Sequence, residues 1–295
     1  MGGPRLRAAR NVPARPTNGY LGSVALDPTS SGLHYLDPSP LGALAVAEHR
    51  VDEPRATVVA IHGGLDRASS FARVSRRLDD FDTVAYDRRG YQRSRALGPG
   101  DLAQHVADLA RVIAWAAPTG PVVLCGHSFG GLVAMTLAAR RPDVAQVVVV
   151  YESPLPWVVA RPSPTPAPGE NPAREAERFF RRVVSDAAWE RLSPEERESR
   201  RLDGPALSAD LREMTQPLAP FELDEIAVPV HYLYGDQRSA PYYHALAHRL
   251  EASSAYFSSR ELAGAQHGAH LSHPDLLARE IRAALAPPSP LAHEH

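Results

Sequence analysis

Short apolar runs alternate with longer amphipathic stretches along most of this 295-residue chain. The runs TVVAI (57–61), VVLC (122–125) and VAQVVVVY (144–151) are apolar at nearly every position. Strands covered by helices on both faces have this pattern, whereas strands with one wet face alternate apolar and polar residues. The alternation with helical stretches therefore predicts βαβ crossovers and a mostly parallel sheet in an α/β fold.

The pattern predicts an eight-stranded sheet with helices on both of its faces. The expected strands are 34–36, 44–49, 57–61, 82–86, 122–125, 144–151, 230–234 and 260–263. The expected helices are 68–78, 102–115, 130–140, 242–251 and 274–285.

The alternation stops between residues 154 and 220. This segment opens with the Pro-rich PLPWVVARPSPTPAPGENP and continues with charged helical sequence such as REAERFFRRVV. We expect a small helical cap at 154–220, inserted over the strand ends of one core that comprises 19–153 and 221–286. The two ends, 1–18 and 287–295, lack apolar periodicity, and we expect a disordered N-terminus and a flexible tail.

Composition narrows the class of protein. With 44% apolar residues, the composition is typical of a soluble globular protein. The 32 basic and 34 acidic residues nearly cancel, so the charge does not favour binding to nucleic acid. The single cysteine, Cys125, excludes an intrachain disulfide and a cysteine-based metal site. No apolar run approaches the roughly 18 residues of a membrane span, and the N-terminus lacks the apolar part of a signal peptide. We expect a cytoplasmic protein that binds no membrane.

The stretch GHSFG, residues 126–130, carries the clearest chemical signal. Ser128 follows a short predicted strand and precedes the helical pattern LVAMTLAARR, which is the context that a Gly-x-Ser-x-Gly nucleophile elbow requires. The helix that starts here would place its partial positive charge beneath a developing oxyanion. The pattern favours Ser128 as a nucleophile over a Gly/Ser turn without chemical meaning.

Two further segments agree with this interpretation. HGGL (62–65) follows the strand TVVAI, and DRRGYQRS (87–94) follows the next strand. With these motifs the chain resembles the α/β-hydrolase superfamily over most of 32–286, although Gln92 stands where the family usually has glycine. The resemblance implies an oxyanion hole formed by the backbone amides of Phe129 and Gly64.

The resemblance also implies a histidine base between the last strand and the C-terminal helix. Among 13 histidines, His267 fits best because it follows small residues in ELAGAQHGAHLSHPDLL. His270 and His273 are expected at the helix entry or the mouth of the site.

The acid of the triad stays open between two residues. The family's usual Gly-x-x-Asp after the seventh strand reads YGDQRSAP here, which puts an arginine at the place of the acid. Glu152 ends the sixth strand, similar to haloalkane dehalogenases that supply the acid there, and Asp236 lies in the turn after the seventh strand. Both fit the chain order Ser, acid, His. Glu152 is favoured, with Asp236 as the alternative.

The sequence therefore predicts a serine hydrolase that cleaves a small apolar ester or related acyl substrate through an acyl-enzyme. No metal and no organic cofactor are implied, and the oligomeric state stays open. Alternatives are a C–C bond hydrolase or cofactor-free perhydrolase that uses the same triad, or a ligand-binding protein that kept the fold without turnover.

Overall fold

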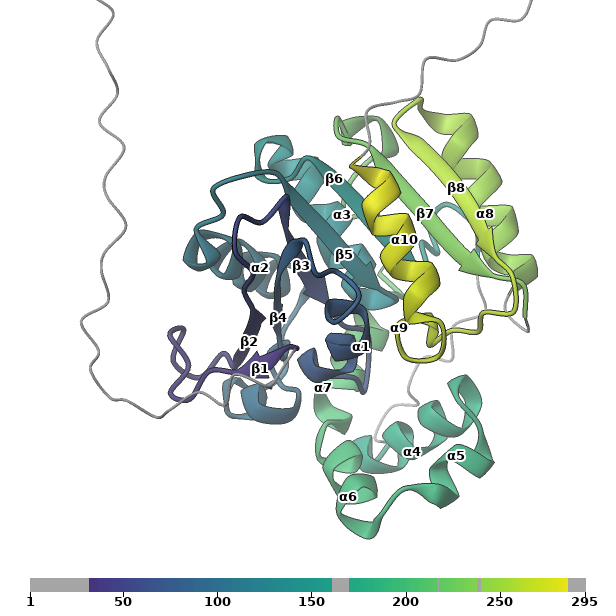
Figure 1. The fold of residues 1–295 in the computed structure, drawn as a ribbon. Coiled ribbons are helices and arrows are strands. Elements are labelled where there is room, and N and C mark those ends of the chain that lie inside the picture. The colour runs from purple at the N-terminus through teal and green to yellow at the C-terminus, as the bar shows by residue number, and fades with distance from the viewer. Residues whose placement is uncertain (1–31, 161–169, 217, 238–239, 286–295) are drawn as a thin grey trace, which may run out of the picture. The chain divides into compact units, whose positions relative to one another are not determined.

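The computed structural model describes residues 32–160, 170–216, 218–237 and 240–285 (Figure 1). The expected disordered N-terminus at 1–18 and the expected tail at 287–295 lie outside the described residues. Within the described part of the chain, no helix combines the length and the apolar character needed to cross a membrane.

One eight-stranded sheet forms the centre of the fold, with the strand order β1-β2-β4-β3-β5-β6-β7-β8. Pairing is antiparallel between β1 and β2 and between β2 and β4, and parallel at every other junction. The mostly parallel eight-stranded sheet is thereby confirmed. The strands are β1 His34–Tyr35, β2 Val46–His49, β3 Ala56–Ile61, β4 Phe81–Tyr86, β5 Val122–His127, β6 Val147–Tyr151, β7 Val230–Gly235 and β8 Phe257–Leu262.

Helices cover both faces of this sheet (Figure 1). Helices α2, α3 and α8 contribute to one apolar core, and α1, α9 and α10 contribute to a second core on the opposite face. The strands β3, β5 and β6 are buried at every position, as expected for strands between two helical layers. The helices are α1 Ala72–Ser75, α2 Leu102–Ala116, α3 Phe129–Arg140, α8 Ala240–Ser253, α9 Ala269–Ser272 and α10 Pro274–Ala284.

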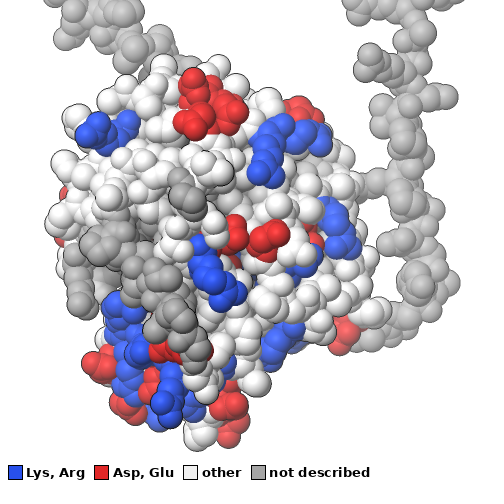
Figure 2. Space-filling model, turned by 180° about the vertical axis from the view of Figure 1, so that it is seen from behind, with Lys and Arg blue, Asp and Glu red and all other residues white. Residues whose placement is uncertain are grey.

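Among the residues that the structure describes, four α-helices lie between β6 and β7, in the segment where the helical cap is expected. We refer to these helices as the insertion: α4 Pro172–Val183, α5 Asp186–Arg191, α6 Pro194–Leu202 and α7 Gly204–Glu213. Buried residues of α4, α5 and α7 pack together with Leu65 and Tyr91 of the core. Side chains of both charges gather on this part of the surface (Figure 2) and form ion pairs such as Arg181 with Glu177.

Three elements have a boundary that differs from the prediction by three residues or more. The expected helix 68–78 is a 3-10 turn, Ala68–Phe71, followed by the single-turn α1. Residues 142–144 form a 3-10 turn that begins at Pro142, so β6 starts at Val147 rather than at residue 144. Strand β8 starts at Phe257 rather than near 260, because its polar residues face solvent at the sheet edge and hide the strand pattern.

A close approach of α3 to β3 fixes the position of the elbow. A Cβ atom on Gly130 would lie 2.2 Å from the carbonyl oxygen of Ile61 and 2.7 Å from that of His62. Both contacts are with backbone at the end of the strand, so neither can be relieved by turning a side chain. Only glycine allows this packing.

We predict that Gly130→Ala lowers the free energy of unfolding by about 3 kcal/mol or more, at the upper end of the range for overpacking. Urea unfolding monitored by circular dichroism measures the loss. The matched control is Gly120→Ala, whose added Cβ would meet nothing closer than Arg55 O at 3.9 Å. Similar stability of the two variants would contradict this account of the elbow.

Candidate active site

Ser128 occupies a strained turn between β5 and α3. Its backbone has φ 53° and ψ −124°, a conformation that non-glycine residues rarely adopt. The Ser128 amide donates to Tyr151 O (2.9 Å), and the Gly131 amide donates to Ser128 O (2.9 Å). The half-buried Ser128 therefore has the strand-turn-helix setting of a nucleophile elbow.

The HGGL loop lies directly against this elbow. A Cβ on Gly63 would lie 2.9 Å from Ser128 Cβ, so the loop approaches the serine as closely as a glycine permits. Gly64 is the next residue, and Phe129 is the first residue of α3, where backbone amides have no partner within the helix. The two residues expected to form the oxyanion hole thus lie on two segments that meet at Ser128.

A buried arginine holds the HGGL loop from behind. Arg88 Nε donates to His62 O (2.9 Å), and Arg88 Nη2 donates to Gly63 O (3.2 Å). The same guanidinium forms an ion pair with Asp210 of α7 at 2.6 Å, and both side chains are almost completely buried. Two loop carbonyls are therefore engaged on the Arg88 side, and the insertion is connected to the loop beside Ser128.

The two carboxylates left open by the sequence lie in different environments. Glu152 Oε2 accepts from His267 Nδ1 at 2.6 Å, and Glu152 Oε1 accepts from the Gly235 amide at 3.1 Å. Asp236 is exposed, and its Oδ2 accepts from the Gly264 amide at 2.9 Å. This amide holds the pKa of the Asp236 carboxyl below its usual range. The structure thus brings Glu152 to His267 and uses Asp236 to hold the turn after β7.

Glu152 reaches His267 because of its backbone conformation. The residue follows β6 with φ 46° and is 1% exposed. Its amide donates to Leu233 O (2.9 Å), which ties it to β7. A carboxylate can only accept here, so His267 Nδ1 carries the proton and the neutral ring has its lone pair on Nε2.

His270 and His273 lie on the segment that follows His267. His270 is 2% exposed, and its Nε2 lies 2.9 Å from Asp66 Oδ2. His273 occupies the N-cap position of α10. Both residues are expected from the sequence at the helix entry or the mouth of the site. The burial of His270 beside Asp66 is not predicted by the sequence.

Cys125 lies on β5, three residues before Ser128, and is 2% exposed. Burial raises the pKa of its thiol to about 12. The thiolate is the reactive form of cysteine, so Cys125 has the character of a small core residue rather than of a second nucleophile.

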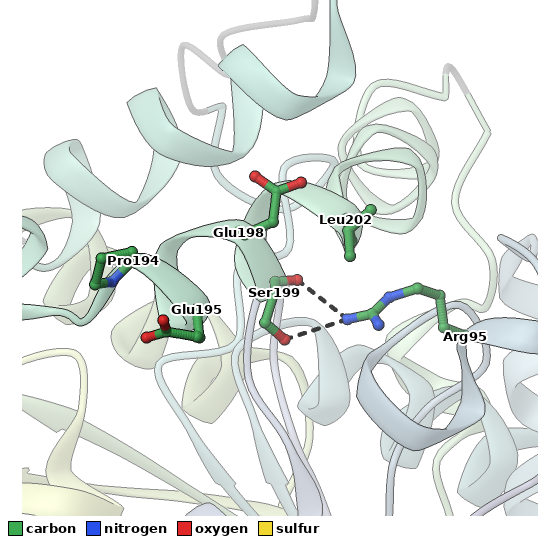
Figure 3. A pocket seen from close by; sticks show the side chains of 6 residues that line it. All are labelled: Arg95, Pro194, Glu195, Glu198, Ser199 and Leu202. Atoms are coloured by element: carbon green, nitrogen blue, oxygen red, sulfur yellow. Dashed lines mark hydrogen bonds between the residues drawn. The ribbon is translucent and has the colours of Figure 1, made fainter.

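A surface pocket lies away from these residues. It is lined by Arg95 and by the α6 residues Pro194, Glu195, Glu198, Ser199 and Leu202 (Figure 3). Arg95 Nη2 donates to Ser199 O at 3.1 Å and pairs with Asp203 at 2.6 Å. None of the predicted catalytic residues lines this pocket, and its arginine is already engaged in joining α6 to the core.

Comparison with known proteins assigns the family. A model of the alpha/beta hydrolase family matches residues 58–280. The chain belongs to this family. A pimeloyl-[acyl-carrier protein] methyl ester esterase from Sodalis glossinidius is 32% identical over 244 residues, which is 74% of this chain and 88% of the esterase. The predicted family and fold are confirmed.

Other relatives match over shorter stretches. Lipase LipV from Mycobacterium tuberculosis is 37% identical over 97 residues, or 33% of this chain and 37% of the lipase. The match thus covers between about a third and a half of the length of the first curated relatives. Among solved structures, a bacterial membrane phospholipase A shares the fold with a TM-score of 0.65 at 20% identity, covering 86% of each chain. The family match and the relatives named lipase and esterase support the prediction of an enzymatic hydrolase.

The buried His62 makes the stability of this site depend on pH. His62 Nδ1 donates to Gly63 O (2.6 Å), and His62 Nε2 accepts from the Arg88 amide (2.8 Å). Burial, followed by the charge of Arg88, lowers the pKa of His62 to about 3. The native state keeps this ring neutral, whereas the unfolded chain protonates it near pH 6.5. Below about pH 6.5 the unfolded chain binds a proton that the native ring does not. The contribution of His62 to the free energy of unfolding is therefore highest at neutral pH and decreases as the pH falls below about 6.5.

We predict that His62→Gln weakens the pH dependence of the free energy of unfolding between pH 7 and pH 5. One such group contributes at most about 1.4 kcal/mol per pH unit. Urea unfolding at three pH values measures the slope. His248→Gln, an exchange on the exposed side of α8, is the control. Equal slopes for His62→Gln, His248→Gln and the parent would contradict the prediction.

Proposed function

We propose that this protein is a serine hydrolase that cleaves a small ester or related acyl substrate through Ser128, His267 and Glu152. The observation that carries the proposal is the 2.6 Å hydrogen bond between Glu152 and His267, two residues that are 115 positions apart. This bond directs the lone pair of His267 to Nε2, the nitrogen required of a base. The strained elbow at Ser128 supports the assignment of the nucleophile.

The reaction follows from these roles. His267 Nε2 accepts the proton of Ser128 Oγ as this oxygen bonds to the acyl carbon, and the carbonyl oxygen becomes an oxyanion. The amides of Gly64 and Phe129 would stabilise this charge, and each such donor is typically worth about 10²–10³ in turnover. The imidazolium then protonates the leaving group, which departs with the bond electrons. A water molecule, deprotonated by His267, attacks the acyl-enzyme and releases the acid and free Ser128.

A comparison of the two carboxylates tests the proposal. We predict that Glu152→Gln lowers kcat by roughly 10²–10⁴ with little change in KM, because the amide can hold His267 in the wrong tautomer without altering the substrate pocket. Asp236→Asn, the matched amide exchange, should lower kcat less than about tenfold. Initial rates with p-nitrophenyl butyrate measure both. Greater loss in Asp236→Asn than in Glu152→Gln would contradict the proposed triad.

A second candidate for the substrate is an ester that carries an anionic group, rather than the apolar ester that the sequence favours. It rests on Arg200 of α6. Arg200 Nε and Nη1 are buried and have no hydrogen-bond partner among the described residues. Burial lowers the pKa of this guanidinium, and the positive charge of Arg67 lowers it further, while Asp66 acts in the opposite direction. Arg200 is thus within electrostatic range of Arg67 and Asp66, and its guanidinium lies 5.1 Å from the centre of the Phe180 ring. Two buried N–H groups without a hydrogen-bond partner among the described residues favour an anionic ligand.

Two p-nitrophenyl esters distinguish the substrate classes. We predict that Arg200→Gln lowers kcat/KM for p-nitrophenyl hemisuccinate by about 10–100-fold, the loss expected for a hydrogen bond to a charged group. The neutral butyrate ester should change less than about twofold. Arg197→Gln, on the same helix but hydrogen-bonded to Trp189 O at 3.0 Å, is the control. Equal effects of Arg200→Gln on the two esters would exclude the anionic substrate and leave the apolar ester.

A further inference from the structure

Three potential metal ligands come together beside the elbow. Asp66 lies just after the HGGL loop, His127 ends β5 directly before Ser128, and His270 lies in α9. One ligand atom from each of the three residues lies within 4.8 Å of the other two. His127 is 7% exposed and His270 is 2% exposed, and the Asp66 side chain is 17% exposed. The cluster is thus largely withdrawn from solvent.

The hydrogen bonds of His127 determine where its lone pair lies. His127 Nε2 is 2.7 Å from the carbonyl oxygen of His267, which can only accept, so Nε2 carries the proton. His127 Nδ1 is then an acceptor, and it is buried without a hydrogen-bond partner in the described part of the chain.

The unprotonated Nδ1 of His127 faces a second acceptor, the carboxylate of Asp66. Asp66 Oδ2 lies 3.8 Å from His127 Nδ1 and 2.9 Å from His270 Nε2. Two acceptor atoms 3.8 Å apart cannot bond to each other directly, so the lone pair of His127 Nδ1 and the Asp66 carboxylate favour a cation between them.

The spacing and chemistry of the cluster fit a metal ion of the zinc type. Ligands about 2.0–2.1 Å from zinc in a tetrahedral arrangement lie about 3.4 Å from one another. Asp66 Oδ2 lies 2.9 Å from His270 Nε2 and 3.8 Å from His127 Nδ1, one distance below this value and one above it. Two imidazoles and one carboxylate form a donor set that zinc and its neighbours in the transition series prefer. His270 can offer Nε2 by moving its proton to Nδ1, which has no hydrogen-bond partner among the residues that the structure describes.

We propose that Asp66 Oδ2, His127 Nδ1 and His270 Nε2 form a binding site for one divalent transition-metal ion, with water as the fourth ligand. The ion would connect three segments that surround the elbow: the HGGL loop, the end of β5 and the segment that follows His267. The ligands come from chain positions up to 204 residues apart, so no spacing in the sequence indicates the site.

Metal titration tests this proposal without any measurement of activity. The full chain is freed of metal with EDTA, the chelator is removed, and Zn²⁺ binding is followed by calorimetry and Co²⁺ binding by visible absorption. We predict one saturable ion per chain and the intense d–d bands of tetrahedral Co²⁺. Asp66→Asn and His270→Gln should each weaken binding by about 100-fold or more, beyond the 10–100-fold typical of residues that only orient a ligand.

Two variants serve as matched controls. Asp236→Asn and His273→Gln make the same exchanges nearby and should leave the affinity unchanged. Binding that persists in Asp66→Asn and His270→Gln would place the ion at other histidines and overturn the proposal. Wild-type protein with no saturable site, so that only water bridges Asp66 and His127, would overturn it as well. If the two variants fail to fold, the Co²⁺ spectrum of the wild type still decides, because isolated surface histidines give only weak octahedral bands.

Discussion

The parallel alignment of β3, β5, β6 and β7 is the constraint on which the candidate site depends. Because these strands run in the same direction, their carboxyl ends meet at one edge of the sheet. The HGGL loop, Ser128, Glu152 and Asp236 each follow one of these ends. In α/β sheets ligands bind at the carboxyl ends of the strands, and these candidate catalytic residues lie at that edge.

The strands of the sheet and the elbow could be predicted from sequence because their signals are local. Continuous apolar runs indicate strands covered on both faces, and glycines at 126 and 130 mark the turn at Ser128. The prediction placed the start of edge strand β8 too late because four of its six residues are polar. The first predicted helix was too long because its residues form two short turns. Local signals are weakest where an element is exposed on one side or is very short.

The sequence favours Glu152 as the acid but leaves Asp236 as an alternative, because both follow parallel strands and both fit the chain order. The choice depends on backbone conformation: Glu152 adopts φ 46° and reaches His267, whereas Asp236 is engaged by the Gly264 amide. The Arg88–Asp210 pair and the cluster of Asp66, His127 and His270 were not foreseen for a similar reason. Their partners lie in separate segments, and only the folded chain brings them together.

Labelling with a fluorophosphonate tests the central claim, that Ser128 is an activated nucleophile, most directly. An activated Oγ displaces fluoride and forms a stable bond to phosphorus, and mass spectrometry of the digested protein locates the added group. The account predicts rapid labelling of the peptide that contains Ser128, labelling at least about 100-fold slower in His267→Ala, and none of this peptide in Ser128→Ala. An unlabelled Ser128 peptide in the folded wild type, or labelling that is as fast in His267→Ala, would contradict it.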